Sequence, residues 1–230
     1  MQNNRFNKLQ SSLRIKFKDL KLLEQAFIHR SYLNEFKVDL PSNERLEFLG
    51  DSILSLVVSR HLFEARREDT EGDLTNLRAY IVKTKSLAQA AKNLNLGGYL
   101  QLSRGEAASG GQNNPQLLAN TYEALLGAIY LDLGLEEVKE VTKKTLLSLF
   151  TSELKKGPPQ DAKSRLQETV QEKIKTSPYY KILQTKGPDH AKQFMVAVYV
   201  GGKEYGKGIG NSKQVAEEQA AREALKKMTK

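Results

Sequence analysis

Three carboxylates stand close together in the segment Asn43–Ser52, which reads NERLEFLGDS. Glu44, Glu47 and Asp51 are spaced at i, i+3 and i+7, so a helix of about 3.6 residues per turn places them on one face. Their neighbours are mostly apolar, and an isolated charge in such surroundings is costly. A hard divalent cation bound by oxygens would relieve the repulsion among the three acids. The alternative is a solvated acidic stripe on an ordinary helix.

A second polar pair lies in the predicted helix Leu117–Leu131. Asn120 and Glu123 stand at i and i+3, so their side chains share one face of an otherwise apolar helix. Two such helices can converge to present four oxygen ligands, which is the arrangement expected for Mg²⁺ completed by waters. A structural ion pair is the alternative explanation for these polar residues.

The charge of the chain is unevenly distributed. The chain has 230 residues with 36 Lys and Arg against 27 Asp and Glu, a net charge of +9. Residues 158–230 carry 14 basic and 8 acidic residues, or +6, which leaves 22 and 19, or +3, for residues 1–157. A basic module beside an acidic metal site suggests a protein that binds a polyanion and then cuts it.

Composition excludes several other kinds of chemistry. The chain has no cysteine, which excludes disulfides and thiolate metal sites. It has only three histidines, so it offers few candidate catalytic residues for a histidine-based hydrolase. His29 is expected to be a structural hydrogen-bonding residue and His61 a surface residue. No signal sequence or membrane span is apparent, so we expect a soluble cytoplasmic protein without membrane association and without a small-molecule organic cofactor.

Two domains of different character are predicted. Residues 1–155 form the first domain, residues 156–160 are a linker rich in Gly and Pro, and residues 161–230 form the second. In the first domain the pattern is helical almost throughout from Asp19 to about Phe150, and an amphipathic run begins it over residues 20–27. The predicted helices of the first domain cover residues 43–63, 74–94 with a break near Thr84, 117–131 and 135–154, and residues 103–115 are predicted to be a loop.

The second domain is predicted to have the order αβββα. A helix over 161–176 precedes strands over 179–185, 193–200 and 203–208, with a tight turn at Gly201-Gly202. Ser212 then caps a final helix that ends near Met228 and has an alanine-rich face. The predicted fold class is therefore an all-α N-terminal domain plus an α+β (αβββα) domain.

Several sequence blocks resemble the bacterial ribonuclease III family. The segment Asn43–Ser52 is similar to its signature motif, and further blocks occur in the family's order over essentially the whole chain: His29-Arg30-Ser31, Glu71-Gly72-Asp73-Leu74, Leu77-Arg78-Ala79, Gly105-Glu106, Ser109-Gly110-Gly111 and Glu123–Asp132. The αβββα tail, including Gly187-Pro188-Asp189-His190, resembles the family's double-stranded-RNA-binding domain.

The resemblance implies an endonuclease that hydrolyses double-stranded RNA with Mg²⁺, for which Mn²⁺ can substitute. The implied catalytic residues are Asp51, Glu123, Glu44 and Glu71, and the implied metal ligands are Glu47, Asp51, Asn120 and Glu123. The family normally has Asp where this chain has Asn120. An amide oxygen can bind Mg²⁺ but supplies no negative charge, so the alternative function is a cleavage-impaired binder of double-stranded RNA.

The resemblance also implies partners and RNA contacts. The family's nuclease domain is a homodimer, and Phe48, Leu49 and Leu56 are candidates for its seam. The residues expected to contact RNA lie in the first helix of the tail, in one loop and at the start of the last helix: Arg165, Gln167, Glu168, Thr169, His190, Lys213 and Gln214. Processing of structured precursor RNAs, such as rRNA and mRNA, is the expected role.

Overall fold

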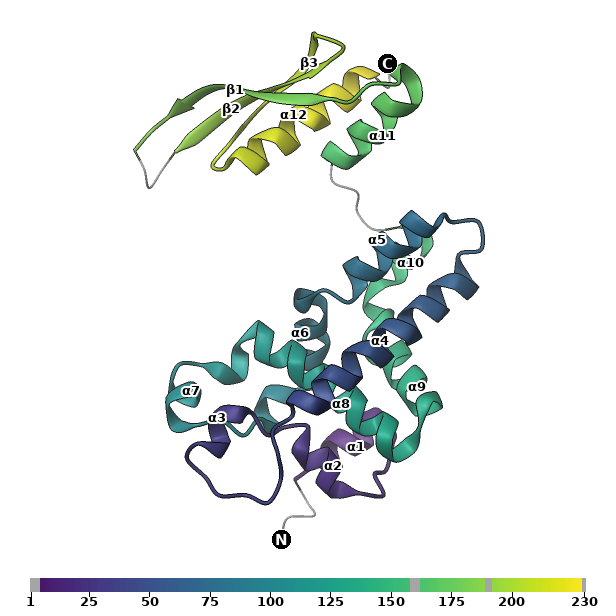
Figure 1. Cartoon of the computed structure of the whole chain (residues 1–230), viewed down its shortest axis with the longest axis vertical. Helices are drawn as coiled ribbons and strands as arrows, with labels where there is room; N and C mark the ends of the chain where they lie inside the picture. Colours follow the sequence, from purple (N-terminus) through teal and green to yellow (C-terminus); the bar gives the residue numbers. More distant parts are fainter. Residues whose placement is uncertain (1–4, 158–161, 189–191, 229–230) are drawn as a thin grey trace. The chain divides into compact units, whose positions relative to one another are not determined.

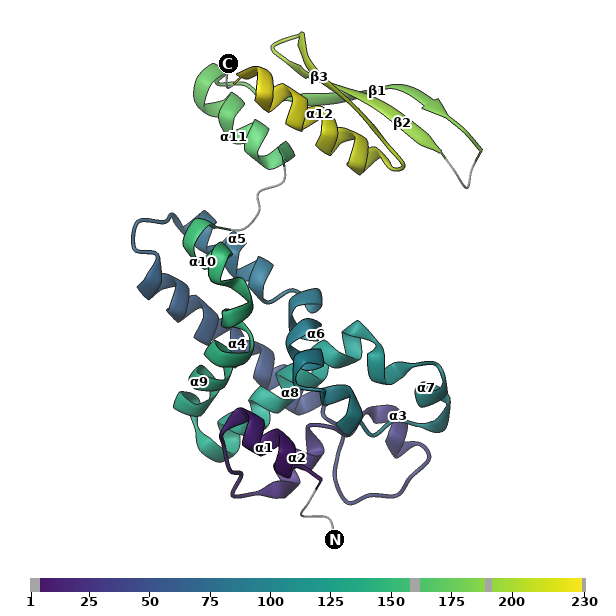
Figure 2. The same cartoon turned by 180° about the vertical axis from the view of Figure 1, so that it is seen from behind.

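The computed structural model describes residues 5–157, 162–188 and 192–228, which divide into two compact units (Figures 1 and 2). The first unit spans Met1–Pro158 and the second spans Pro159–Lys230. The first is helical, and the second contains a three-stranded antiparallel sheet with two helices, which confirms the predicted fold class. None of the described helices is long and apolar enough to cross a membrane.

The helical unit contains ten α-helices and three short 3₁₀-helices among its described residues. The α-helices are α1 (Asn7–Leu13), α2 (Leu20–Gln25), α3 (Arg30–Leu33), α4 (Glu44–Ala65), α5 (Glu71–Ile81), α6 (Thr84–Asn93), α7 (Arg104–Ala108), α8 (Pro115–Leu133), α9 (Leu135–Thr145) and α10 (Thr151–Lys156). The 3₁₀-helices are η2 (Leu96–Tyr99), η3 (Gly111–Asn113) and η4 (Leu147–Phe150).

Helices α4 and α8 form the centre of this unit, and they touch backbone to backbone (Figure 1). A Cβ atom built on Gly50 of α4 would lie 1.8 Å from the carbonyl oxygen of Glu123, and one built on Gly127 of α8 would lie 2.3 Å from that of Leu46. Real Cβ atoms cannot approach a backbone oxygen so closely. Only glycine at both positions therefore allows this crossing, and the α8 residues around it, from Ala124 to Ile129, are all buried.

The structure confirms one sequence-based expectation about the helices and corrects others. The predicted break near Thr84 is present, since α5 ends at Ile81 and α6 begins at Thr84. The predicted loop 103–115, however, contains α7 and η3, because Ser103 accepts a hydrogen bond from the N–H of Glu106 and caps α7. The predicted helix 135–154 is interrupted by η4, and α1 was not predicted.

The second unit has the predicted αβββα order. Its elements are α11 (Ala162–Ile174), β1 (Tyr179–Lys186), β2 (Gln193–Val200), β3 (Lys203–Gly210) and α12 (Lys213–Met228), and the sheet order is β1-β2-β3. Both helices lie on the same face of the sheet in the two views (Figures 1 and 2).

Glycines on β3 allow α12 to pack closely on the sheet. Cβ atoms on Gly206 and Gly208 would lie 2.4 and 2.1 Å from the carbonyl oxygens of Ala220 and Ala216. Ala216, Ala220 and Ala224 are fully buried on the facing side of α12, as the predicted alanine-rich face requires. Small residues on both elements thus bring the helix against the strand.

The glycine contact between α4 and α8 predicts a large effect from one methyl group. Gly50→Ala should lower the free energy of unfolding by about 1–3 kcal/mol or more, because the added Cβ meets a backbone oxygen that cannot rotate away. Urea unfolding followed by circular dichroism would measure it. Gly105→Ala is the matched control, because Gly105 lies in α7 with nothing within 4 Å of its added Cβ. Equal stability of the two variants would contradict the packing argument.

Candidate functional site

One pocket of about 610 Å³ in the helical unit brings the predicted acidic residues of α4 and α8 together. Helix α4 contributes Glu44, Glu47 and Asp51 to its lining, and α8 contributes Asn120 and Glu123. The remaining lining residues are His29, Arg30, Asn43, Phe48, Leu100, Leu117 and Thr121. The pocket flanks the glycine crossing, since Gly50 contacts the backbone of Glu123 itself.

The start of α4 is fixed by a buried asparagine. Asn43 is only 3% exposed, its N–H donates to the carbonyl of Ile28 at 2.8 Å, and its side-chain amide donates to the carbonyl of Ala26. The carbonyl of Asn43 in turn accepts the hydrogen bond from the N–H of Glu47. The first residue of the motif therefore anchors the acidic helix to the segment before α3. The spacing of the acidic residues gives no signal for this role of Asn43.

The start of α8 is fixed by Asn114 and Pro115. The side chain of Asn114 accepts a hydrogen bond from the N–H of Gln116 at 2.9 Å, and Pro115 occupies the first helical position, where no N–H is needed. Asn120 lies one turn after Gln116, and Glu123 one turn later still. Because the helix begins at a defined residue, the polar pair lies at a defined depth in the pocket.

The carboxylates in the pocket raise one another's pKa. Burial raises the pKa of Glu123 from 4.5 to about 7, and the nearby negative charges of Asp51 and Glu47 add to this rise. Burial likewise raises the pKa of Glu47, as do the charges of Glu44 and Asp51, while a hydrogen bond from Asn120 opposes the rise. The site therefore holds more negative charge than its own surroundings can balance.

Positive charge from the protein itself reaches only the edge of this cluster. Arg30 is the only Lys or Arg that lines the pocket among the described residues, and its guanidinium lies 3.8 Å from Glu44. No ion pair within the described part of the chain includes Glu47, Asp51 or Glu123. The alternative of a structural ion pair therefore has no support at these three residues.

The donor set of the pocket fits a hard divalent cation. Glu47, Asp51 and Glu123 offer carboxylate oxygens, the ligands that Mg²⁺ and Mn²⁺ prefer. Searched over the described residues, the structure contains no group of three or more His, Cys, Asp or Glu already close enough to form a metal cluster. Among the described residues the three carboxylates are therefore not gathered around one point, although their chemistry suits such an ion.

Two expectations about the acidic residues differ from the structure. Helix α4 is not buried all round: Glu44 and Asp51 are exposed, and Phe48 is 77% exposed. The helix turns one face to solvent, so the argument from burial applies only to Glu47 among the three acids of the motif. Glu71 does not line the pocket; it begins α5, where it accepts a hydrogen bond from Thr75, and its catalytic role stays a prediction.

His29, the N-cap of α3, and Arg30, its first residue, complete the pocket wall. The Nδ1 atom of His29 lies 2.8 Å from the hydroxyl of Ser31 and accepts from the N–H of Ser31, so His29 caps α3 in the structural role expected of it. Burial lowers the pKa of His29, although the charges of Glu106 and Glu44 oppose this. Arg30 was quoted only as part of a motif, and its position at the pocket edge had no sequence signal.

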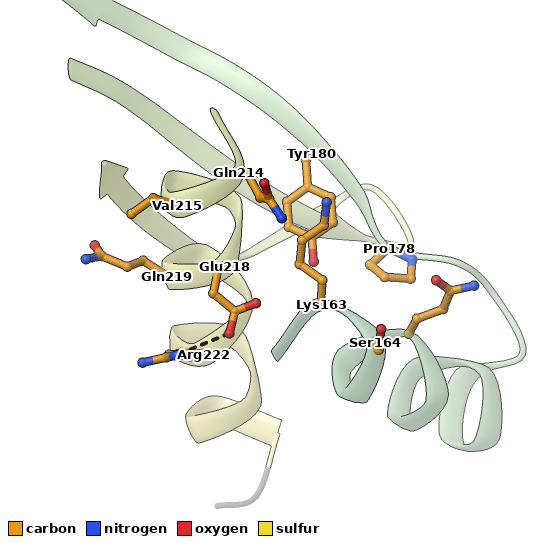
Figure 3. Close-up of a pocket in the computed structure, with 10 residues that line it drawn as sticks. Lys163, Ser164, Pro178, Tyr180, Gln214, Val215, Glu218, Gln219 and Arg222 are labelled. Atoms are coloured by element: carbon orange, nitrogen blue, oxygen red, sulfur yellow. Dashed lines mark hydrogen bonds and ion pairs between the residues drawn. The ribbon is translucent and has the colours of Figure 1, made fainter. Parts of the chain in front are cut away.

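The second unit contains a pocket of about 720 Å³ between α11, the start of β1 and α12 (Figure 3). Gln167 of α11 and Gln214 of α12, both predicted RNA contacts, line it together with Lys163 and Ser164. Two predicted RNA contacts, one from each helix, therefore line the same pocket. Their role in RNA binding stays a prediction.

A hydrogen-bonded carboxylate and one ion pair join α11 to α12. Both carboxylate oxygens of Glu218 accept from the backbone N–H of Ala162, at 2.9 and 3.0 Å, and Glu218 also pairs with Arg222 (Figure 3). Lys163 pairs with Glu217 at 2.5 Å. A carboxylate from α12 thus caps the described start of α11, which fixes the distance between the two helices.

The other predicted RNA contacts are distributed over these two helices. Arg165, Glu168 and Lys213 are exposed, as a contact surface requires. Thr169 is half-buried, and its hydroxyl donates to the carbonyl of Arg165 in its own helix. His190 lies outside the described residues.

Comparison with known families assigns both units. The family model described as ribonuclease-III-like matches residues 19–149, and the model described as double-stranded RNA binding motif matches residues 162–228. The first match contains every residue of the acidic pocket. The second begins and ends with the described α11 and α12.

Individual relatives match over most of the chain. A Ribonuclease 3 of Borreliella burgdorferi is 42% identical over 227 residues, covering 99% of this chain and 93% of the relative. A Ribonuclease 3 of Dehalococcoides mccartyi is 44% identical over 222 residues, covering 94% and 92%. A solved nuclease domain of ribonuclease III from Campylobacter jejuni is 42% identical with a TM-score of 0.59, covering 64% of this chain and 99% of that domain.

The raised pKa of Glu123 predicts how stability depends on pH without divalent cations. A carboxyl whose pKa rises from 4.5 to about 7 on folding contributes stability that is fully present below pH 4.5 and is lost as the pH rises through 7. Glu123→Gln should lack that loss. Relative to wild type it should gain about 1–2 kcal/mol between pH 4.5 and 8, after allowance for solvent screening. Urea unfolding in EDTA at both pH values measures the difference, and parallel pH profiles would contradict the assignment.

Proposed function

This chain belongs to the ribonuclease III family of double-stranded-RNA endonucleases, and on that premise we propose that Mg²⁺ bound in the acidic pocket supports its cleavage of RNA. The observation that carries the proposal is the convergence of Glu47, Asp51 and Glu123 on one pocket with no basic partner among the described residues. Mn²⁺, which accepts the same oxygen ligands, should substitute.

The ion would supply what the protein side chains lack. When bound, it lowers the pKa of a coordinated water toward neutrality and stabilises negative charge on the phosphate. Glu47, Asp51 and Glu123 would hold it, and Glu123 would have to lose its proton to do so, because its pKa without metal is about 7. Arg30, with its side chain 75% exposed at the pocket edge, is positioned to bind a phosphate of the substrate.

The raised pKa of Glu123 is also consistent with a role in proton transfer. Its side chain is half-buried between Asp51 and Glu47, so its charge responds to whatever positive charge enters the pocket. Glu44, held by Ser42 and by Arg30, would orient the arginine and not a water. Three acids of the pocket would thus bind the cation, and the fourth, Glu44, would position the guanidinium of Arg30.

The enzyme is an endonuclease despite the amide at position 120. The relatives named Ribonuclease 3 cover nearly the whole chain, and no observation favours the cleavage-impaired binder over the active enzyme. Three carboxylates remain for the cation, which is sufficient when waters complete the coordination. We propose that the substrates are structured precursor RNAs, such as rRNA and mRNA, in the cytoplasm.

A homodimer would pair two such pockets. Helix α4 carries Phe48, Leu56 and Phe63 on one face, and these are 77%, 57% and 72% exposed. Exposed large apolar side chains in a row indicate a protein contact surface. Leu49, the third candidate for the seam, is partly buried and packs against the core, and its place in the seam stays a prediction. The solved nuclease domain from Campylobacter jejuni is described as structurally flexible in a region involved in dimer formation.

Removing one carboxylate should separate cleavage from binding. Glu123→Ala should reduce cleavage of a long RNA duplex in Mg²⁺ by at least about 100-fold, because the cation loses a ligand. Duplex affinity, measured by filter binding in EDTA, should change by less than about twofold, since the second unit is unaltered.

Glu137→Ala, which removes an exposed glutamate of α9 outside the pocket, is the matched control and should keep wild-type cleavage. Equal loss of cleavage and binding in Glu123→Ala would contradict the assignment. Retention of an uncut complex by the wild type, with cleavage restored by Asn120→Asp, would instead favour the cleavage-impaired binder.

A charge placed in the apolar face of α4 should weaken the dimer. Phe63→Glu should raise the dimer dissociation constant by at least about tenfold, because an unpaired carboxylate would be buried at the seam. Light scattering coupled to size-exclusion chromatography would report the mass over a dilution series. Leu131→Glu, at a 53% exposed leucine of α8, is the control and should leave the mass unchanged. A wild-type protein that stays monomeric at every concentration would refute the dimer.

A further inference from the structure

The side-chain amide of Asn120 lies between two neighbours with opposite hydrogen-bonding properties. Gln116, one turn earlier in α8, donates from Nε2 to Oδ1 of Asn120 at 2.8 Å. On its other side Asn120 shares the pocket with Glu47 of α4, and hydrogen bonding from Asn120 opposes the rise in the pKa of that carboxyl. An ionised carboxylate can only accept, so the NH₂ group of Asn120 faces Glu47 and its carbonyl oxygen faces Gln116.

The position of Gln116 is set by the start of its helix. Its N–H donates to the side chain of Asn114 at 2.9 Å, directly after the helix cap and Pro115. One helical turn separates Gln116 from Asn120, which is the spacing at which two side chains meet. The pair is therefore built by α8 alone, and Glu47 reaches it from α4.

We propose that Gln116 is a positioning residue that keeps Asn120 a hydrogen-bond donor to Glu47 and withholds its carbonyl oxygen from a cation in the pocket. The inference rests on the proposed function, since it concerns how the same site holds its metal. The cation would then be bound by Glu47, Asp51 and Glu123, and Asn120 would orient one of these ligands.

An aspartate at position 120 would place Gln116 in the opposite role. One carboxylate oxygen would accept from Gln116 while the other stayed available to the cation, because a carboxylate accepts at both oxygens. Gln116 would then support metal binding, whereas beside Asn120 it opposes it. The sign of the effect of Gln116 therefore depends on the residue at position 120.

The test measures binding of Mn²⁺ alone to the full chain by electron paramagnetic resonance, without RNA. In the otherwise wild-type protein, Gln116→Met should raise Mn²⁺ affinity about two- to fivefold, because the amide becomes free to turn its oxygen to the ion. In the Asn120→Asp background the same change should leave the affinity unchanged or lower it. Methionine is a good helix former, so α8 should be retained, and thermal unfolding would verify this.

An equivalent amide pair elsewhere supplies the matched control. Gln89 donates to Oδ1 of Asn93 at 2.9 Å with the same spacing in α6, and neither residue lines the acidic pocket. Gln89→Met should leave Mn²⁺ affinity unchanged in both backgrounds. A shift of equal size there would show that the Gln116→Met effect is unspecific, and that would overturn the proposal.

The outcomes separate this proposal from the proposed function. Wild-type Mn²⁺ binding that Glu123→Ala removes, together with no response to Gln116→Met, would overturn the role of Gln116 alone. A response of the same sign in both backgrounds would also overturn it, since it would indicate a merely structural role. Absence of any Mn²⁺ binding that depends on Glu123 would refute the proposed metal site, and the positioning role with it.

Discussion

The backbone contact between α4 and α8 is the constraint on which the site depends. Gly50 and Gly127 let the two helices approach until a Cβ atom at either position would meet a carbonyl oxygen of the other helix. Glu47 lies one turn before Gly50, Asp51 directly follows Gly50, and Glu123 lies one turn before Gly127. A wider crossing would move these carboxylates apart. The distance between the acids is therefore set by residues that have no side chain.

That approach creates an electrostatic imbalance that the protein does not correct for itself. Burial and the charges of Asp51 and Glu47 raise the pKa of Glu123 to about 7. Arg30, the only Lys or Arg that lines the pocket among the described residues, is engaged with Glu44. Such unbalanced charge lowers the free energy of unfolding, and apolar residues at these positions would give a more stable protein. Retaining the acids is understandable if a divalent cation occupies the pocket during function.

Much of this could be predicted from sequence because periodicity and motif order are local properties. The spacing of Glu47 and Asp51, the αβββα order and the break near Thr84 all follow from residues close together in the chain, and the structure confirms the last two. The predictions that were wrong concern features that depend on tertiary contacts or on a single capping residue. The exposure of Phe48 follows from which face of α4 meets α8, and the short α7 from a single serine cap, neither of which periodicity reports.

The second unit shows the same use of small residues to place functional ones. Gly206 and Gly208 of β3 let α12 rest on the sheet through its alanines, and Glu218 of α12 then caps the described start of α11. The distance between the two helices, and so between Gln167 and Gln214, follows from this packing. In both units, positions where a methyl group would collide determine where polar groups meet, and such positions give no chemical signal in the sequence. Motif residues that carry no chemistry of their own, like Gly50, are explained by that geometry.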